Sequence, residues 1–315
     1  MFRFLGGTTI RISIRRFQRI YDPNSGVHAI YDYAKERPTT HIGIGDTMRR
    51  VVYDARYIPD GSAIALKLSS FLHPAWRLAT YKRNQAYEHA AFICMKDTIR
   101  MVQHTHHNHT PIPIFLDAEQ DDLHEVELAT YKKLIMAQHE QHQYMPNTPN
   151  PPILYKTYQM YRRDAMDELM GDMESNMNMV YGIKLVRGAY LHRDKGLRVL
   201  YDTKQAVDKN YNDAITYVLK HNNIRRHLLI ATHNDESIDH ALRELSTSLY
   251  RYHPQYNGDT YVAFAQLLGM NDVATKRLSK LYKVYKYVPY GGYIETLPYL
   301  SRRLYENYSI IRYMV

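Results

Sequence analysis

Short runs of β-branched and aromatic residues alternate along the chain with longer segments whose apolar residues recur every three to four positions. The runs are typical of buried strands, and the longer segments are typical of amphipathic helices. The predicted strands are 27–33, 63–71, 112–116, 153–158, 179–186, 227–231, 260–265 and 284–288. The predicted helices are a long region from 72 to about 103, followed by 117–138, 160–177, 199–220, 235–245, 272–281 and 294–307.

This alternation predicts the fold class. Eight strand–helix units in about 300 residues indicate an α/β protein whose parallel sheet closes into a (β/α)₈ barrel of the TIM type. An open doubly wound sheet is the alternative, but no G-x-G-x-x-G sequence follows any predicted strand. We expect a single barrel domain over residues 1–315, with 1–25 as a helical lead-in.

The first 21 residues are rich in arginine and contain no acidic residue, a composition that also occurs in mitochondrial transit peptides. The competing interpretation is that 10–21 forms the first amphipathic helix of the fold. We favour the helix, because little chain precedes the first predicted strand.

Two segments lack any regular period and are predicted to be loops, 104–110 and 139–152. The first holds histidines at 104, 106, 107 and 109. Metal sites of this kind usually combine histidines with cysteines or carboxylates, and none is spaced beside this run. We therefore predict no metal site.

The composition indicates that the binding partners are anionic, but it does not say which anionic partner the protein binds. The 315 residues are 45% hydrophobic and carry a formal net charge of +9, which favours a phosphate-bearing cofactor, an anionic membrane surface or nucleic acid. The single cysteine, Cys94, excludes an internal disulfide and a thiolate metal cage. No apolar run reaches the ~18 residues that a membrane-spanning helix requires.

The last predicted helix carries four functional side chains on one face. Tyr299, Arg302, Arg303 and Glu306 stand at i, i+3, i+4 and i+7. Two adjacent arginines form a fork that suits a planar carboxylate. A solvated basic turn is the alternative interpretation.

Polar residues also cluster at the predicted carboxyl ends of the strands, where barrel enzymes place their active sites. No Ser–His–Asp arrangement, paired glycosidase carboxylates or P-loop is present, so a cofactor-dependent reaction on a small anion fits best. These strand-end residues are Lys67, Asp117, Lys156, Gln159, Lys184, Arg187, Tyr190, Thr232, His233, Gln266 and Tyr287.

Seven segments, in this order along the chain, resemble the proline dehydrogenase family: LKLSS (66–70), FLDAEQ (115–120), KTYQMYRRDA (156–165), IKLVRGAYL (183–191), ATHND (231–235), FAQLLGM (264–270) and YVPYGGYIETLPYLSRRLYEN (287–307). The resemblance extends over nearly the whole chain. It implies a distorted (β/α)₈ barrel, with the substrate helix after the eighth strand, that binds FAD without a covalent bond. It also implies oxidation of L-proline to Δ1-pyrroline-5-carboxylate, the first step of proline catabolism to glutamate, with electrons passed to a quinone.

The resemblance assigns the substrate residues. Arg302 and Arg303 would bind the proline carboxylate, and Glu306 would hold the two arginines. Tyr287, Tyr299 and Leu267 would pack against the ring of the substrate. Lys67 and Asp117 would form the charged floor of the pocket, with Tyr190 beside it.

The resemblance also assigns the cofactor residues. Lys184 would lie near the reactive flavin nitrogen, where a cation stabilises the negative charge of reduced flavin. Lys156 stands where the family usually has an amide side chain near the flavin, and it could raise the flavin potential, clash with Lys184 or point away. The remaining implied cofactor residues are Asp117, Gln159, Val186, Arg187, Gly188, Ala189, Thr203, Lys204, Thr232, His233, Gln266, Arg303 and Glu306.

Substrate choice, location and alternatives complete the expectations. Tyr287 would crowd a 4-hydroxyl group, because related hydroxyproline dehydrogenases carry a smaller residue there, so we expect proline to be preferred.

The form of the motifs implies peripheral association with the mitochondrial inner membrane; a cytoplasmic or cytoplasmic-membrane location is the alternative. Two other functions stay open: a catalytically degenerate FAD-binding barrel, and a basic nucleic-acid-binding protein whose tyrosines stack on bases.

Overall fold

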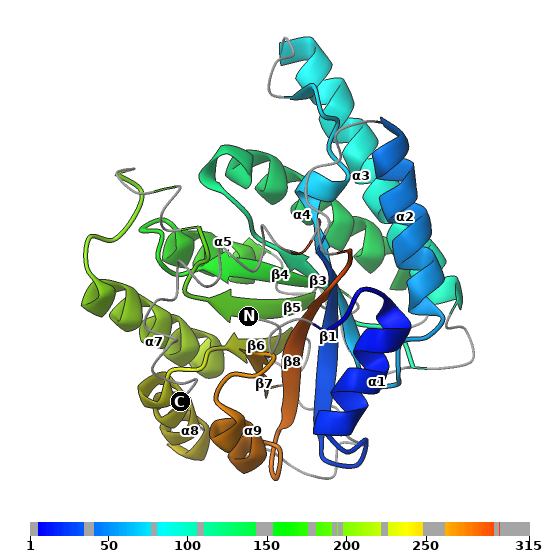
Figure 1. The fold of residues 1–315 in the computed structure, drawn as a ribbon. Coiled ribbons are helices and arrows are strands. Elements are labelled where there is room, and N and C mark those ends of the chain that lie inside the picture. Colours follow the sequence, from blue (N-terminus) through cyan, green and yellow to red (C-terminus); the bar gives the residue numbers. More distant parts are fainter. Residues whose placement is uncertain are drawn as a thin grey trace.

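The protein forms a closed barrel of eight parallel strands in the order β1-β2-β3-β4-β5-β6-β7-β8, with helices on its outside (Figure 1). The computed structural model describes residues 6–34, 41–76, 81–105, 110–142, 154–175, 181–190, 194, 198–221, 226–247, 262–292 and 296. The strands are β1 (Val27–Tyr33), β2 (Ala63–Lys67), β3 (Ile114–Asp117), β4 (Leu154–Gln159), β5 (Tyr181–Val186), β6 (Arg226–Ala231), β7 (Val262–Leu267) and β8 (Lys283–Tyr290). The predicted (β/α)₈ barrel is confirmed.

The described helices are α1 (Ile10–Ile20), α2 (His41–Ala55), α3 (Tyr81–Thr105), α4 (Asp121–His142), α5 (Ala165–Ser175), α7 (Lys204–His221), α8 (Asp235–Thr247) and α9 (Asp272–Leu278). The sequence pattern did not predict α2, whose first five residues include Gly43 and Gly45 and therefore have a weak helix propensity. Burial of Val51, Val52 and Ala55 stabilises it instead. The second strand is shorter than predicted, because residues Leu68–Ser70 form a 3₁₀ turn directly after Lys67.

Helix α1 is part of the fold, as favoured from the sequence. The Thr9 hydroxyl caps its amino end, and Ile10, Phe17 and Tyr21 are buried. The residues before α1 pair with the end of β8: the Gly6 amide donates to the Pro289 carbonyl at 2.9 Å, and the Gly291 amide donates to the Gly7 carbonyl at 3.1 Å. The helix therefore begins beside the carboxyl end of β8.

Alternate strand positions point into the barrel, as the pleat of a strand requires. The interior is filled by a compact cluster of small and aromatic side chains: Ile30, Ala63, Ala65, Phe115, Tyr155, Leu229, Ala263, Ala265, Tyr285 and Tyr287. The outward-facing strand residues pack against the helices in a second, larger core. Among the described helices, none combines the length and the apolar character needed to cross a membrane.

Candidate active site

Two ion pairs and a tyrosine occupy the interior at the carboxyl ends of the strands. Lys67, the last residue of β2, donates to both carboxylate oxygens of Asp32 on β1, at 2.5 and 2.6 Å. Lys184 of β5 donates to Asp117, the last residue of β3, at 2.5 Å. The Tyr287 hydroxyl of β8 donates to the second oxygen of Asp117 at 2.5 Å. Five strands thus contribute to one buried network.

The network is nearly closed to solvent and electrically balanced. Lys67, Asp32 and Asp117 expose 4%, 1% and 8% of their surface. Burial raises the pKa of Asp32, with the attraction of Lys67 opposing it and the Asp117 charge adding to it. Burial acts in the same direction on Asp117, but Lys184 and Lys67 together lower the pKa of Asp117 below its usual value. The charges of the two lysines and the two carboxylates therefore cancel. A further anion buried at this place would require additional cations.

Lys184 occupies the position best suited to an electron-rich ring. Its ammonium group lies 5.7 Å from the ring centre of Phe115 and 5.2 Å from that of Tyr287. Thr157 stands beside it on β4, and the buried Thr157 hydroxyl has no hydrogen-bond partner within the described part of the chain. A buried cation next to an unpaired hydroxyl fits a ligand with hydrogen-bonding ring atoms, as in a flavin.

The segment after β5 makes a tight turn. Gly188 has a φ of +132°, which disfavours residues with a side chain. A Cβ atom there would lie 2.0 Å from the Tyr161 ring. Arg187 donates to Asp208 at 2.6 Å and to the Thr232 and Ser237 hydroxyls at 2.8 Å each. This arginine therefore joins the end of β5 to α7, β6 and α8.

The other predicted residues occupy neighbouring strand and helix ends. The Thr203 hydroxyl accepts a bond from the Ala206 amide at the start of α7. Lys204 is exposed and pairs with Asp208. Burial, with Arg187 and Lys286 nearby, lowers the pKa of His233 to about 4. Tyr190 is buried, and Gln159 donates to the Glu119 carbonyl at 3.1 Å. Leu267 packs against the interior cluster.

The structure contradicts the prediction for Lys156. Its neighbour Thr157 is in register with Lys184 and shares the interior, so Lys156 points outward. There it pairs with Glu168 at 2.9 Å and with Asp172, both on α5. Its assignment to the cofactor is therefore wrong, and its charge does not reach the interior beside Lys184.

The prediction for Gln266 is wrong for the same reason. Its neighbour Leu267 is in register with Tyr287 and faces the interior. Gln266 lies outside, where it accepts a bond from the Thr275 hydroxyl of α9 at 2.5 Å.

Sequence reasoning missed Asp32 and a pair of buried glutamates. Asp32 was detectable, because His28, Ile30 and Asp32 alternate along the first strand and Asp32 is its last inward position. The Glu119 carboxylate accepts bonds from the Ser69 amide at 2.8 Å and the Ser69 hydroxyl at 2.6 Å. Glu127 accepts from the Glu119 amide at 3.0 Å, and burial, with the charge of Glu119, raises its pKa well above normal. These contacts link the turns after β2 and β3.

Several predicted residues lie outside the described part of the chain. These are Tyr299, Arg302, Arg303 and Glu306 of the last predicted helix, and His106, His107 and His109 of the histidine-rich loop.

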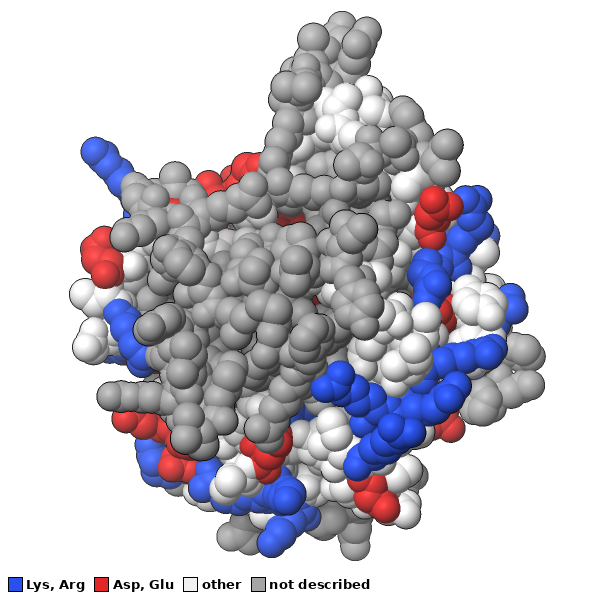
Figure 2. Space-filling view, in the orientation of Figure 1, with Lys and Arg blue, Asp and Glu red and all other residues white. Residues whose placement is uncertain are grey.

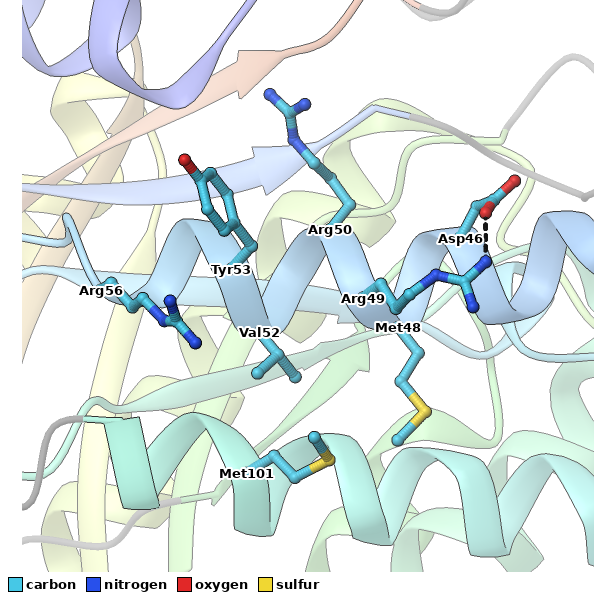
Figure 3. Close-up of a pocket in the computed structure, with 8 residues that line it drawn as sticks. All are labelled: Asp46, Met48, Arg49, Arg50, Val52, Tyr53, Arg56 and Met101. Carbon is cyan, nitrogen blue, oxygen red and sulfur yellow. Dashed lines mark hydrogen bonds and ion pairs between the residues drawn. The ribbon is translucent and has the colours of Figure 1, made fainter.

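A pocket of about 590 Å³ lies on the outer surface, between α2 and α3. Figure 3 shows Met48 and Val52 of α2 pointing toward Met101 of α3, while Arg50 and Tyr53 point away from α3. Arg49 pairs with Asp46 at its edge at 2.6 Å. This pocket is formed by helices rather than strand ends and is separate from the buried network.

A family model described as proline dehydrogenase matches residues 18–314. Human mitochondrial proline dehydrogenase 1 is 38% identical over 173 residues, covering 51% of this chain and 28% of the human protein. Rat hydroxyproline dehydrogenase is 34% identical over 177 residues, covering 51% of this chain and 37% of the rat protein. The matched segments thus span well under half the length of these relatives.

The fold also has a counterpart among solved structures. Proline utilization A from Bdellovibrio bacteriovorus superposes with a TM-score of 0.76 over 97% of this chain and 32% of the bacterial chain, at 17% sequence identity. At this identity the likeness concerns the fold alone. The family match over nearly the full length carries the assignment, and this chain belongs to the proline dehydrogenase family.

Proposed function

We propose that this chain is an FAD-dependent proline dehydrogenase that oxidises L-proline to Δ1-pyrroline-5-carboxylate and passes the electrons to a quinone. The main structural support is the buried network in which Lys184 and Tyr287 both bond Asp117. It occupies the end of the barrel where this fold class carries out its chemistry. We take residues 1–315 as one barrel domain with 1–25 as its lead-in.

The described residues fit a flavin. When bound, FAD supplies a two-electron acceptor that this chain's own side chains cannot provide. Lys184 and the unpaired Thr157 hydroxyl would meet its ring. The proposed contacts for the rest of the cofactor come from the ends of β4, β5 and β6 and from the start of α7: Gln159, Val186, Arg187, Gly188, Ala189, Thr203, Lys204, Thr232 and His233.

The charge balance of the network explains why the substrate needs additional cations. Lys67 and Lys184 are already paired with Asp32 and Asp117. A substrate carboxylate would therefore be a third buried anion with only two lysines available. We assign the missing charges to Arg302 and Arg303, held by Glu306. Tyr299, Leu267 and Tyr287 would then pack against the substrate ring, with Tyr190 beside it.

The reaction removes a hydride from the ring carbon next to nitrogen and a proton from the nitrogen. Hydride leaves readily only when the amine is neutral, and neighbouring cations disfavour its ammonium form. We therefore infer that the amine loses its proton on binding. A rate profile that stays flat from acidic to alkaline pH is incompatible with this step.

The electron acceptor and the location follow from the same proposal. We infer a quinone in a membrane that the protein contacts peripherally. The human relative is named as mitochondrial, which supports the mitochondrial inner membrane; the cytoplasmic membrane is the alternative.

Anaerobic titration of the purified protein with L-proline tests the activity. We expect a yellow protein whose flavin absorption is bleached by L-proline and restored by a soluble quinone. A colourless protein that does not take up FAD would refute the cofactor assignment. A yellow protein that L-proline does not bleach would indicate a degenerate FAD-binding barrel instead.

A further inference from the structure

Helix α1 presents an exposed face that the packing of the barrel does not use. Arg11, Arg15 and Arg19 are exposed and stand at i, i+4 and i+8, so they form one stripe along the helix. On the adjacent stripe, Ile12 and Ile20 expose 47% and 49% of their surface. The core contacts of α1 are made by its other face, which includes Ile10 and Phe17. Packing of the barrel therefore does not account for Ile12 and Ile20.

The charge of this stripe is not compensated locally. Helix α1 contains no acidic residue, and within the described part of the chain no carboxylate forms an ion pair with Arg11, Arg15 or Arg19. Figure 2 shows Lys and Arg residues gathered over the region of α1, at the lower right of the molecule. The basic surplus of the sequence thus has a concentrated site on the surface.

The basic surface continues onto α2 through tyrosines. The Arg11 guanidinium lies 4.2 Å from the Tyr57 ring centre and donates to the Tyr57 hydroxyl. The Tyr57 hydroxyl in turn donates to that of Tyr53 at 3.1 Å. Tyr53 is 46% exposed, and the Arg56 guanidinium lies 5.8 Å from its ring centre. We call these residues, with Ile12, Arg15, Arg19 and Ile20, the α1–α2 face.

We propose that the α1–α2 face is the surface on which this protein docks onto a bilayer of anionic phospholipid. Arginines beside exposed isoleucine and tyrosine side chains suit the surface of an anionic membrane, where cations meet the lipid headgroups and amphipathic side chains lie at the boundary. The arginines would meet lipid phosphates, and the isoleucines and Tyr53 would enter the boundary between headgroups and acyl chains. Nucleic acid would use the arginines and tyrosines but gives no reason for two exposed isoleucines.

The position of α1 relates the docking surface to the candidate active site. The residues just before α1 pair with the end of β8, at the barrel end that holds the buried network. The amino end of α1 therefore lies beside the rim of the candidate active site, and the rest of the helix extends along the side of the barrel toward the start of β1. This docking surface rests on the membrane contact proposed above but not on the proposed reaction, so its test needs no turnover.

Sedimentation of the purified full chain with lipid vesicles tests the proposal. One vesicle preparation contains phosphatidylcholine alone, and the other also contains phosphatidylserine. We expect binding to the second that weakens with salt, and little binding to the first. Replacing Arg11, Arg15 and Arg19 together by glutamine should lower the partition coefficient on the order of 100-fold, at about fivefold for each arginine.

A matched variant controls for net charge. Lys209→Gln, Lys220→Gln and Arg243→Gln together remove three exposed charges from α7 and α8, and this variant should bind the anionic vesicles as the wild type does. Ile12→Ser with Ile20→Ser should also weaken binding while the arginines remain. Equal binding by the two triple variants overturns the proposal, and so does tighter binding to a single-stranded oligonucleotide that displaces the vesicles. Bound flavin and the melting temperature of each variant show whether it is folded.

Discussion

Asp32 and Lys67 stand 35 positions apart in the sequence, yet both carboxylate oxygens of Asp32 accept bonds from the Lys67 ammonium group, at 2.5 and 2.6 Å. The pair joins β1 to β2 inside the barrel. The positive charge of Lys67 also lowers the pKa of the neighbouring Asp117. Each of the two ion pairs in the network therefore depends on the other.

The first prediction concerns Asp32→Asn. Asparagine leaves Lys67 without a full counter-charge, so Lys67 is expected to turn toward Asp117 and weaken the bond between Asp117 and Lys184. We expect kcat/KM for L-proline to fall by roughly 10- to 100-fold, the loss typical of a charged hydrogen bond. Steady-state kinetics per bound flavin measures this.

Asp54→Asn is the matched control, because Asp54 is also a buried carboxylate but bonds Arg50 and Tyr290 at 2.7 and 2.8 Å on the outer side of the barrel. It should lower the melting temperature and leave kcat/KM per flavin unchanged. Asp32→Glu should recover part of the activity. Wild-type kcat/KM in Asp32→Asn would show that the pair is only structural.

The second prediction concerns substrate choice at Tyr287. The bond from its hydroxyl to Asp117 fixes the ring inside the barrel, next to the buried network, where we expect it to exclude a 4-hydroxyl group. Tyr287→Ser should raise the ratio of kcat/KM for 4-hydroxy-L-proline over L-proline by about tenfold or more. Tyr287→Phe keeps the ring, so it should lower activity without changing this ratio. A wild-type enzyme that uses both substrates equally well contradicts the prediction.

The third prediction separates two buried lysines on neighbouring strands. Lys156→Met removes the partner of Glu168 and Asp172 on the outer side of β4. It should cost about 3 kcal/mol in the free energy of unfolding, as other broken buried pairs do, and leave the flavin absorption spectrum unchanged. Lys184→Met should change the spectrum and lower the flavin reduction potential. A changed spectrum in Lys156→Met would contradict the outward orientation of Lys156.

The fourth prediction concerns acid stability. Burial, with Lys283 nearby, lowers the pKa of His227 from 6.5 to about 4. Between pH 6.5 and pH 4 the histidine binds a proton in the unfolded chain but stays neutral in the folded protein. The contribution of His227 to the free energy of unfolding is therefore complete above pH 6.5 and is lost as the pH falls toward 4. The loss from this one residue is at most about 3 kcal/mol.

Urea unfolding at several pH values measures the effect of His227. His227→Asn should reduce the dependence of stability on pH in this window, even if it lowers stability overall. Asparagine at the exposed His221 should leave the dependence unchanged. Identical pH slopes for wild type and His227→Asn would contradict the assignment.

Strand and helix order were predictable because the fold depends on hydrophobic periodicity, which the sequence carries directly. The residues Lys67, Asp117, Lys184 and Tyr287 were predictable from the strand pattern together with the resemblance to the family. Lys156 and Gln266 were misassigned, because membership of a strand does not by itself say which way a side chain points. Gln159 and Lys156 are three positions apart on one strand, so they cannot both face the interior.

Contacts between distant segments were less accessible. The role of Asp32 depends on the position of Lys67 in a different strand, and the bond from Ser69 to Glu119 depends on how two turns meet. Helix α2 was missed because its packing stabilises a segment whose local propensity is weak.

The aromatic residues at the centre of the barrel limit the routes by which a small molecule can reach the buried network. The Phe115 ring packs against both Tyr155 and Tyr285, with its centre 4.4 and 5.8 Å from theirs. The Tyr155 ring occupies the space that a side chain at Gly182 would need. Among the described residues these rings close the barrel below the charged network. A substrate that binds at the network would then have to enter and leave on the side of the carboxyl ends of the strands, so bound product would exclude the next substrate.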